Sequence, residues 1–288
     1  MKRRQILYRG IASGIGLALG SHNLISRATA SNKSSPLFRF VALADVGTGN
    51  IGQLAIADVM DDYFRQDPFK LVLMAGDNIY EDGAIERAGA TFGRPYRFLR
   101  KQKVPFYAVL GNHDIRTNNG VDQVNYSAFN MQGRRYYTFT QGIVQYFALD
   151  TNSNANWSKQ LNWLDKNLAK STATWKIVYG HHPLYSSGVH GSDPELIAKL
   201  SPLFAHYGVH LYINGHDHNY ERTKAIEGTT YLTCGAGAKT RPVGSSDWTA
   251  KSAARLSFAT IDVYPERLKI QGIGKDGKVF DRGEIVNS

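Results

Sequence analysis

The sequence has a single cysteine and no long hydrophobic run. One cysteine cannot pair within the chain, so a small disulfide-stabilised scaffold is excluded. No uninterrupted apolar run approaches the roughly 20 residues that a membrane-spanning helix needs. A content of 42% hydrophobic and 11% aromatic residues excludes intrinsic disorder. At 288 residues, the chain is long enough for one large domain or two small ones.

Acidic residues are absent from residues 1–30, which contain five basic ones. A basic start, a short apolar stretch and a small-residue ending at 28–30 are typical of a cleaved export signal. An amphipathic helix packed on the domain is the alternative. The pair Arg3 and Arg4 resembles a twin-arginine signal. We therefore expect an exported protein, periplasmic or extracellular, by the twin-arginine route and without a stable membrane anchor once the signal is removed.

The formal charge of +10 is concentrated at this end of the chain. Without residues 1–30 the net charge is +5. No basic cluster interleaves with aromatic residues in the remainder, so we expect no nucleic-acid partner. The residual charge suits a protein that handles anions, but it does not identify the function.

Strand-like and helix-like patterns alternate from residue 38 onwards. This alternation predicts a single α/β catalytic domain over residues 38–288, preceded by a linker at 31–37. Short runs of β-forming residues predict strands over 38–44, 70–75, 105–110, 135–140, 143–149, 175–179, 209–213, 229–233, 255–263 and 267–273.

Helices are predicted between several of these strands. Apolar residues recur at helical spacing over 54–64 and again over 158–168, where Ser158 is the expected N-cap. A third helix is expected to begin after Asp193, which is followed by proline, and to end at Gly208.

Five of the predicted strands end at side chains that can bind a metal. The residues in question are Asp45, Asp77 with Tyr80, Asn112-His113-Asp114, His181-His182, and His216-Asp217-His218. Ligand sites in α/β sheets lie just outside the carboxyl ends of strands, so these five points are expected to converge. Each is weak alone, because an aspartate after a strand is more often a turn residue or a helix cap. Together they predict a metal site, because the alternative needs five independent coincidences.

The donor types indicate which metals this site would hold. Carboxylate, phenolate, amide and imidazole donors without a thiolate argue against structural zinc and against an iron–sulfur cluster. The lone Cys234 is expected to be a small buried hydrophobe. These candidate ligands are too many for one ion and suit two, bridged by a carboxylate. A phenolate favours a hard ion such as Fe(III), and neutral imidazole and amide donors suit a divalent partner.

The sequence blocks around these residues resemble those of the purple acid phosphatases, which belong to the calcineurin-like metallophosphoesterases. The blocks are Asp45, 76–80, 111–114, 180–183 and 215–218. The resemblance spans residues 38 to about 237 and is closest to the small, tartrate-resistant type. It implies an α/β fold, a four-layer metallophosphoesterase β-sandwich of two mixed sheets flanked by α-helices.

The resemblance also implies roles for individual residues. A ferric ion would be held by Asp45, Asp77, Tyr80 and His218. A divalent ion (iron, zinc or manganese) would be held by the bridging Asp77 together with Asn112, His181 and His216. The catalytic candidates are the substrate-side histidines His113 and His190, and His182, which follows a ligand position.

The implied activity is that of an acid phosphatase acting on small phosphate monoesters. A metal-bound hydroxide would attack phosphorus in line, and His113 or His190 would protonate the leaving group. One alternative is a phosphodiesterase or nucleotidase of the same superfamily. Another, of a different class, is a non-catalytic secreted metal-binding module.

One segment, residues 238–248, follows a predicted strand and carries two cationic side chains. Lys239 and Arg241 are candidate residues of the substrate rim, where they would favour anionic leaving groups. An ordinary solvated loop is an equally good interpretation of this segment.

Overall fold

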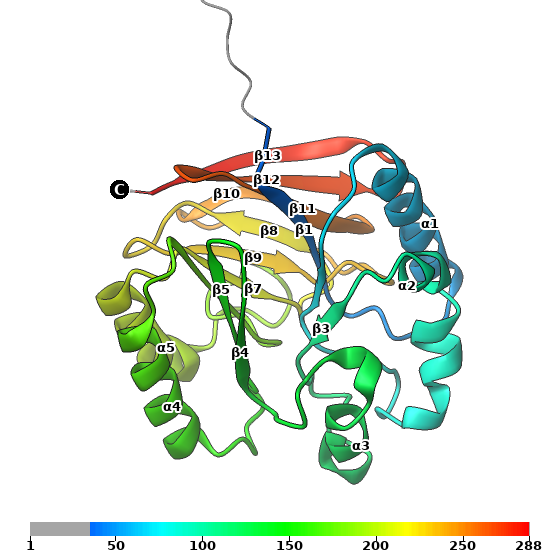
Figure 1. Ribbon diagram of the computed structural model, residues 1–288, viewed down its shortest axis with the longest axis horizontal. Helices are drawn as coiled ribbons and strands as arrows, with labels where there is room; N and C mark the ends of the chain where they lie inside the picture. The colour runs from blue at the N-terminus through cyan, green and yellow to red at the C-terminus, as the bar shows by residue number, and fades with distance from the viewer. Residues whose placement is uncertain (1–34, 288) are drawn as a thin grey trace, which may run out of the picture. The chain divides into compact units, whose positions relative to one another are not determined.

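Two mixed β-sheets lie between flanking helices in the computed structural model, which describes residues 35–287 (Figure 1). Helices α1 (Ile51–Gln66) and α2 (Arg97–Lys101) flank one sheet, and α4 (Trp157–Lys170) and α5 (Pro194–Tyr207) flank the other. The four-layer α/β prediction is therefore confirmed. The export-signal prediction for residues 1–30 lies outside the described residues.

The first sheet has six strands in the order β13-β12-β11-β1-β2-β3. Strands β1, β2 and β3 run parallel, and β11 pairs antiparallel with β1. The bounds are β1 (Phe38–Leu43), β2 (Val72–Met74), β3 (Phe106–Ala108), β11 (Ser257–Val263), β12 (Arg267–Gly274) and β13 (Val279–Val286).

The second sheet has seven strands in the order β10-β8-β9-β7-β6-β5-β4. Strands β5, β6, β7 and β9 run parallel in its centre, and antiparallel strands complete both edges. The bounds are β4 (Tyr137–Gln141), β5 (Val144–Ala148), β6 (Trp175–Tyr179), β7 (Leu211–Asn214), β8 (Tyr220–Thr223), β9 (Thr230–Cys234) and β10 (Thr249–Ala253).

Short helical turns connect the larger elements. They are α3 (Val121–Val124), the 3-10 turns Ile85–Arg87, Asn118–Gly120 and Ser127–Phe129, and a π-type turn at Gly89–Gly93. Within residues 35–287, no helix combines the length and the apolar content that a membrane crossing requires.

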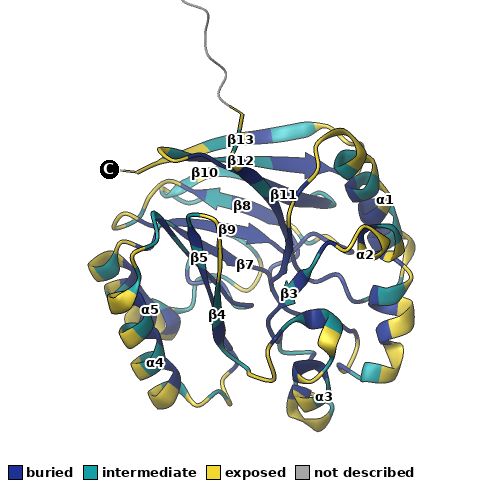
Figure 2. Ribbon diagram, in the orientation of Figure 1, coloured by how far each residue is buried: buried dark blue, intermediate teal, exposed yellow. Residues whose placement is uncertain are grey.

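Successive side chains of β6 point to opposite faces of the sheet and so belong to two separate hydrophobic cores. Trp175, Ile177 and Tyr179 pack into the core that the two sheets share, whereas Val178 points the other way and packs with Leu164 and other residues of α4 and α5. Because both faces of β6 are covered, the strand needs apolar residues at nearly every position. Figure 2 shows the central strands buried and the outer faces of the helices exposed.

The helix ends confirm one prediction and correct another. Asp193 caps α5 by accepting the backbone N–H of Leu196, and Gly208 ends this helix with a φ of 63°. The prediction that Ser158 caps α4 is wrong. Asn156 is the N-cap, because its side-chain oxygen accepts the backbone N–H of Lys159 at 3.2 Å, and Ser158 already lies inside the helix.

Three strands were not predicted from the sequence: β8, β10 and β13. Each contains charged or small polar residues, and none of the residues in β10 is buried. Such strands form because their neighbours in the sheet supply hydrogen-bond partners, which a local hydrophobic pattern does not reveal.

Candidate metal centre

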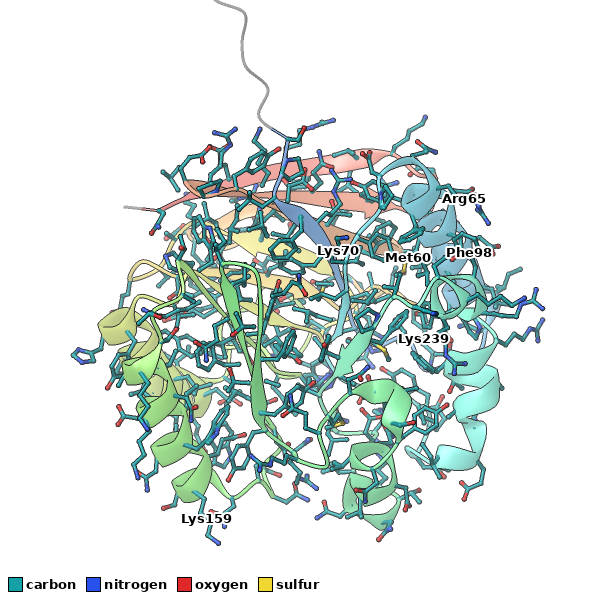
Figure 3. The ribbon with its side chains drawn as sticks, in the orientation of Figure 1. Met60, Arg65, Lys70, Phe98, Lys159 and Lys239 are labelled. Carbon is teal, nitrogen blue, oxygen red and sulfur yellow. The ribbon has the colours of Figure 1, made fainter. Side chains whose placement is uncertain are left out.

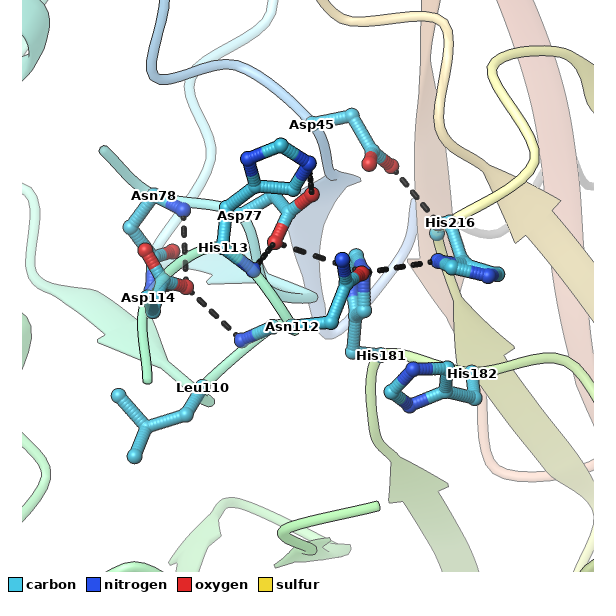
Figure 4. A network of polar contacts seen from close by, with 12 residues as sticks. Asp45, Asp77, Asn78, Leu110, Asn112, His113, Asp114, His181, His182 and His216 are labelled. Atoms are coloured by element: carbon cyan, nitrogen blue, oxygen red, sulfur yellow. Dashed lines mark hydrogen bonds and ion pairs between the residues drawn. The ribbon is translucent and has the colours of Figure 1, made fainter. Parts of the chain in front are cut away.

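The five strand-end groups meet at one edge that the two sheets share (Figure 4). Asp45 and Asp77 follow β1 and β2 of the first sheet, whereas His181 and His216 follow β6 and β7 of the second. In each sheet these strands are parallel neighbours, so their carboxyl ends lie side by side. Asp45 Oδ2 accepts the backbone N–H of His216 at 2.9 Å, which joins the two sheets directly at the site.

One group of predicted ligands is built around the Tyr80 hydroxyl. Tyr80 Oη lies 3.0 Å from Asp45 Oδ1 and 3.1 Å from His218 Nε2. His218 Nε2 and Asp45 Oδ1 are 3.4 Å apart, and all three side chains are buried. Burial, followed by the charges of Asp45 and Asp77, raises the pKa of Tyr80 well above its ordinary value. A phenolate at this position therefore requires a bound cation.

A second group is built around the side-chain oxygen of Asn112. Asn112 Oδ1 lies 3.0 Å from His181 Nε2 and 3.0 Å from His216 Nδ1. Burial, followed by the charges of the neighbouring histidines, lowers the pKa of His216 well below its ordinary value. Neutral imidazole is the form that binds metals, and an amide with two imidazoles suits a divalent transition metal.

Asp77 lies between the two groups. Its Oδ1 is 3.6 Å from His181 Nε2, and donor atoms of Asp45, Asp77 and His181 all lie within 4.8 Å of one another. Burial lowers the pKa of His181, but the charges of Asp77 and Asp45 outweigh it and raise that pKa. Among the described residues, neither carboxylate forms an ion pair with a lysine or arginine. This oxygen-rich donor set without thiolate fits a pair of hard or borderline cations, which would neutralise its buried negative charge.

The backbone at three of these residues has an uncommon conformation. Asp45, Asp77 and His216 have φ angles of 57°, 51° and 68°, in the left-handed region that non-glycine residues seldom adopt. Gly76, with a φ of 88°, sits so close to His181 that a Cβ would lie 2.5 Å from the ring Nδ1. The surrounding fold, rather than local preference, holds the donor atoms together, as is common at functional sites.

Asp114, which the sequence pattern groups with the metal-capable strand ends but not with the proposed ligands, is a fully buried hydrogen-bond hub. Its two carboxylate oxygens accept from the backbone N–H groups of Asn78, Ile79 and Gly111 and from the side-chain amides of Asn78 and Gln123. Burial, followed by the charge of Asp77, raises the pKa of Asp114 to about 7. These bonds hold the segment with Asp77 against the segment with Asn112. The position of Asp114, two residues after Asn112, is the sequence signal that could have revealed this structural role.

Thr151 orients two adjacent histidines and was also missed. Thr151 Oγ1 accepts the backbone N–H groups of His181 and His182 at 3.1 and 3.0 Å, and it lies 2.9 Å from His182 Nδ1. With both lone pairs used, the hydroxyl donates to Nδ1, so the ring hydrogen of His182 is on Nε2. Burial, followed by the charge of His181, lowers the pKa of His182 to about 3. Thr151 follows β5, so the strand-end rule could have found it.

The predicted substrate-side histidines, His113 and His190, each contact an arginine. His113 Nδ1 lies 2.5 Å from the carbonyl oxygen of Glu81, and its Nε2 lies 3.2 Å from Arg116 Nη2. A carbonyl only accepts and a guanidinium only donates, so His113 carries its hydrogen on Nδ1 and a lone pair on Nε2. His190 Nε2 contacts Arg241 Nη1 in the same way. In this arrangement neither histidine presents a proton at Nε2.

The structure places both predicted rim residues beside the centre. Lys239 Nζ lies 4.8 Å from the centroid of the Tyr80 ring and 3.4 Å from Glu81 Oε1. The backbone N–H of Arg241 donates to the carbonyl of His218 at 2.8 Å. Cys234, at the end of β9, is fully buried in the core that the sheets share.

Comparison with known proteins places this chain in a phosphoesterase family. Residues 38–220 match the family described as calcineurin-like phosphoesterase. Purple acid phosphatase 7 of Arabidopsis thaliana is 31% identical to this chain, over 88% of the chain and 87% of the relative. Tartrate-resistant acid phosphatase type 5 of Oryctolagus cuniculus is 30% identical, over 71% of the chain and 74% of the relative.

Two solved structures share the fold. The purple acid phosphatase PPD1 from seeds of yellow lupin, Lupinus luteus, superposes with a TM-score of 0.75 at 19% identity, over 88% of this chain and 54% of its own. GAP50 of Plasmodium, described as an anchor in the inner membrane complex, superposes with a TM-score of 0.77 at 22% identity, over 87% and 89%. At these identities the likeness concerns the fold alone.

Proposed function

Because the chain belongs to the calcineurin-like phosphoesterase family and its relatives are purple acid phosphatases, it is a metal-dependent acid phosphatase, and we propose that it hydrolyses small phosphate monoesters with an Fe(III)–M(II) pair. The ferric ligands would be Asp45, Asp77, Tyr80 and His218, and the divalent ligands Asp77, Asn112, His181 and His216. The observation that carries this proposal is the Tyr80 hydroxyl, which lies within hydrogen-bond distance of both Asp45 and His218.

The protein's own groups have distinct tasks around the metals. When bound, the two ions supply positive charge to the phosphoryl oxygens and make water a nucleophile near neutral pH. The backbone N–H of His113 holds Asp77 Oδ1 at 2.9 Å, and Thr151 fixes His182 in one tautomer. The ring of His190 lies 4.2 Å from that of His216, at the side of the divalent group.

Leaving-group protonation falls to His113 or His190 in this proposal. Each presents a lone pair at Nε2 to an arginine, so it must take up a proton there before it can act as an acid. At His113, an anionic substrate that draws Arg116 away from the ring would free this nitrogen for the proton. The contact between Arg116 and His113 would then couple substrate binding to protonation of His113.

The proposed reaction is tested by metal analysis combined with two substrates. The purified protein should contain iron and a second metal, and should cleave p-nitrophenyl phosphate faster than bis(p-nitrophenyl) phosphate. Faster cleavage of the diester would favour the phosphodiesterase alternative. Two bound metals without cleavage of either ester would favour the non-catalytic alternative.

Tyr80→Phe is expected to abolish visible absorbance of the iron-loaded protein. Only a phenolate bound to Fe(III) gives a charge-transfer band here, and phenylalanine removes the donor oxygen while keeping the ring. Tyr136→Phe is the matched control, because Tyr136 is partly exposed and its ring packs on Trp163, away from the centre. A visible band that survives in Tyr80→Phe would remove this tyrosine from the ferric site.

Export of the protein remains a proposal that rests on residues 1–30. The support is the basic start, the apolar stretch and the small residues before Ser31. We propose a periplasmic or extracellular enzyme that reaches its compartment by the twin-arginine route. N-terminal sequencing of the mature protein, expected to begin near Ser31, tests the cleavage; a mature chain that still begins at Met1 would contradict it.

A further inference from the structure

Three cationic side chains surround the metal centre, and each contacts a side chain of the site. Arg116 Nη2 lies 3.2 Å from His113 Nε2, Lys239 Nζ lies 4.8 Å from the Tyr80 ring centroid, and Arg241 Nη1 contacts His190 Nε2. We call Arg116, Lys239 and Arg241 the cationic rim. Its members approach the centre beyond the predicted metal ligands, where the part of a substrate outside the reacting phosphate would lie.

The charge of the cationic rim is largely uncompensated. Among residues 35–287, no carboxylate forms an ion pair with Arg116 or Arg241, and Lys239 pairs only with the exposed Glu81 at 3.4 Å. A guanidinium has five N–H donors, and Arg241 uses only one of its nitrogens in a side-chain contact within this part of the chain. The remaining donors are free to form paired hydrogen bonds with a phosphate or carboxylate.

The segment that carries Arg241 is fixed to the site along its length. The backbone N–H of Arg241 donates to His218 at 2.8 Å. Two residues on, Val243 forms a β-bridge with Gly188, and the N–H of Gly244 donates to the Ser187 carbonyl at 2.9 Å. The segment is therefore not an ordinary solvated loop, because backbone bonds tie it to the loop that carries His190.

Two buried carboxylates fix the loop that carries His190. Asp217 accepts the backbone N–H of His190 at 3.0 Å, and it also accepts the Ser186 hydroxyl. Glu221, 1% exposed, accepts the Ser187 backbone N–H at 2.7 Å and the Thr249 hydroxyl at 2.6 Å. Because the His190 loop is anchored and the Arg241 segment is bonded to it, the fold itself brings Arg241 to His190, which preorganises this arginine for a ligand.

We propose that Arg241, assisted by Lys239, binds a second anionic group on the leaving-group side of the substrate. The preferred substrates would then be phosphate anhydrides and bisphosphates, whose leaving group carries its own phosphate. This inference rests on the proposed function, because the reacting phosphate must occupy the metal centre. A planar guanidinium with paired free donors matches phosphate geometry better than it matches a neutral alcohol or phenol.

The test compares pyrophosphate with phenyl phosphate in four proteins: wild type, Arg241→Gln, Arg241→Lys and Lys159→Gln. Arg241→Gln should lower kcat/KM for pyrophosphate about tenfold to a hundredfold, the range for loss of a charged hydrogen bond. For phenyl phosphate it should lower kcat/KM by about threefold or less, and Arg241→Lys should recover part of the pyrophosphate loss. Lys159→Gln is the charge-matched control, because Lys159 is exposed on α4, far from Lys239 in Figure 3.

A binding measurement supplies a readout that does not depend on turnover. Arg241→Gln should weaken the binding of methylenediphosphonate, which carries two phosphonates, about tenfold or more, and that of orthophosphate much less. Equal losses for the two substrates, or for the two ligands, overturn the proposal and place Arg241 on the reacting phosphate. No loss for either also overturns it. A wild-type protein that cleaves neither substrate would count against the proposed function itself.

Discussion

Asp77→Asn will remove both the metal pair and the phosphatase activity. Asp77 is 2% exposed and lies between the two predicted ligand groups, with donor atoms within 4.8 Å of those of Asp45 and His181. The amide keeps the shape of the carboxylate but removes the charge that both cations need. We expect metal content to fall from two ions per chain to at most one, and kcat/KM to fall by about 1,000-fold or more.

Metal analysis and thermal unfolding will separate loss of metal from loss of fold. A metal that binds only the folded state stabilises it, so chelation should lower the Tm of the wild type by more than it lowers the Tm of Asp77→Asn. Asp58→Asn is a suitable control, because Asp58 is exposed on α1. Should Asp77→Asn bind two metals and cleave an aryl phosphate normally, the dinuclear proposal is wrong.

Asp114→Asn is expected to destabilise the fold strongly even without metal. Each carboxylate oxygen of Asp114 accepts at least two N–H donors, from residues that include Ile79, Gly111 and Gln123. An asparagine must turn an NH2 group toward at least two of these donors, which leaves buried N–H groups unpaired. At about 1–3 kcal/mol for each unsatisfied group, the expected loss is about 3–5 kcal/mol of unfolding free energy.

Urea unfolding of metal-free Asp114→Asn will measure this loss directly. Asp122→Asn is the matched control. Asp122 lies in the same region of the chain and is partly exposed, and its one side-chain hydrogen bond within residues 35–287 is from the Asn118 amide. The control should change the unfolding free energy by about 0.5 kcal/mol or less. A loss in Asp114→Asn that is no larger than in the control would show that the hub contributes nothing to holding the two segments together.

The convergence of the proposed metal ligands could be predicted because of how buried strands are built. A strand covered on both faces, such as β1 or β6, needs nearly continuous apolar residues, so the first polar residue after it marks where the chain leaves the core. Asp45 and His181 stand at such points. Five similar points along one chain were enough to predict the site and, with the family blocks, the two ligand groups.

Elements that depend on distant neighbours were not predictable in this way. The polar strand β10 forms because β8 pairs with it. The N-cap of α4 is Asn156 rather than Ser158. The sequence did not reveal this, because both residue types are good caps and the local pattern does not distinguish them. The buried role of Asp114 depends likewise on donors more than 30 residues away in the chain.

The sequence by itself determined the donor set, the approximate ends of the central strands and the chemical family, because these depend on residue types in continuous stretches. Only the tertiary structure decided how the rim is organised. His190 and Arg241 stand 51 residues apart on two loops. They meet because Asp217 and Glu221 anchor the loop that carries His190, and backbone bonds tie the segment with Arg241 to that loop. Side-chain contacts between distant loops follow from the packing of the whole domain, and no local pattern records them.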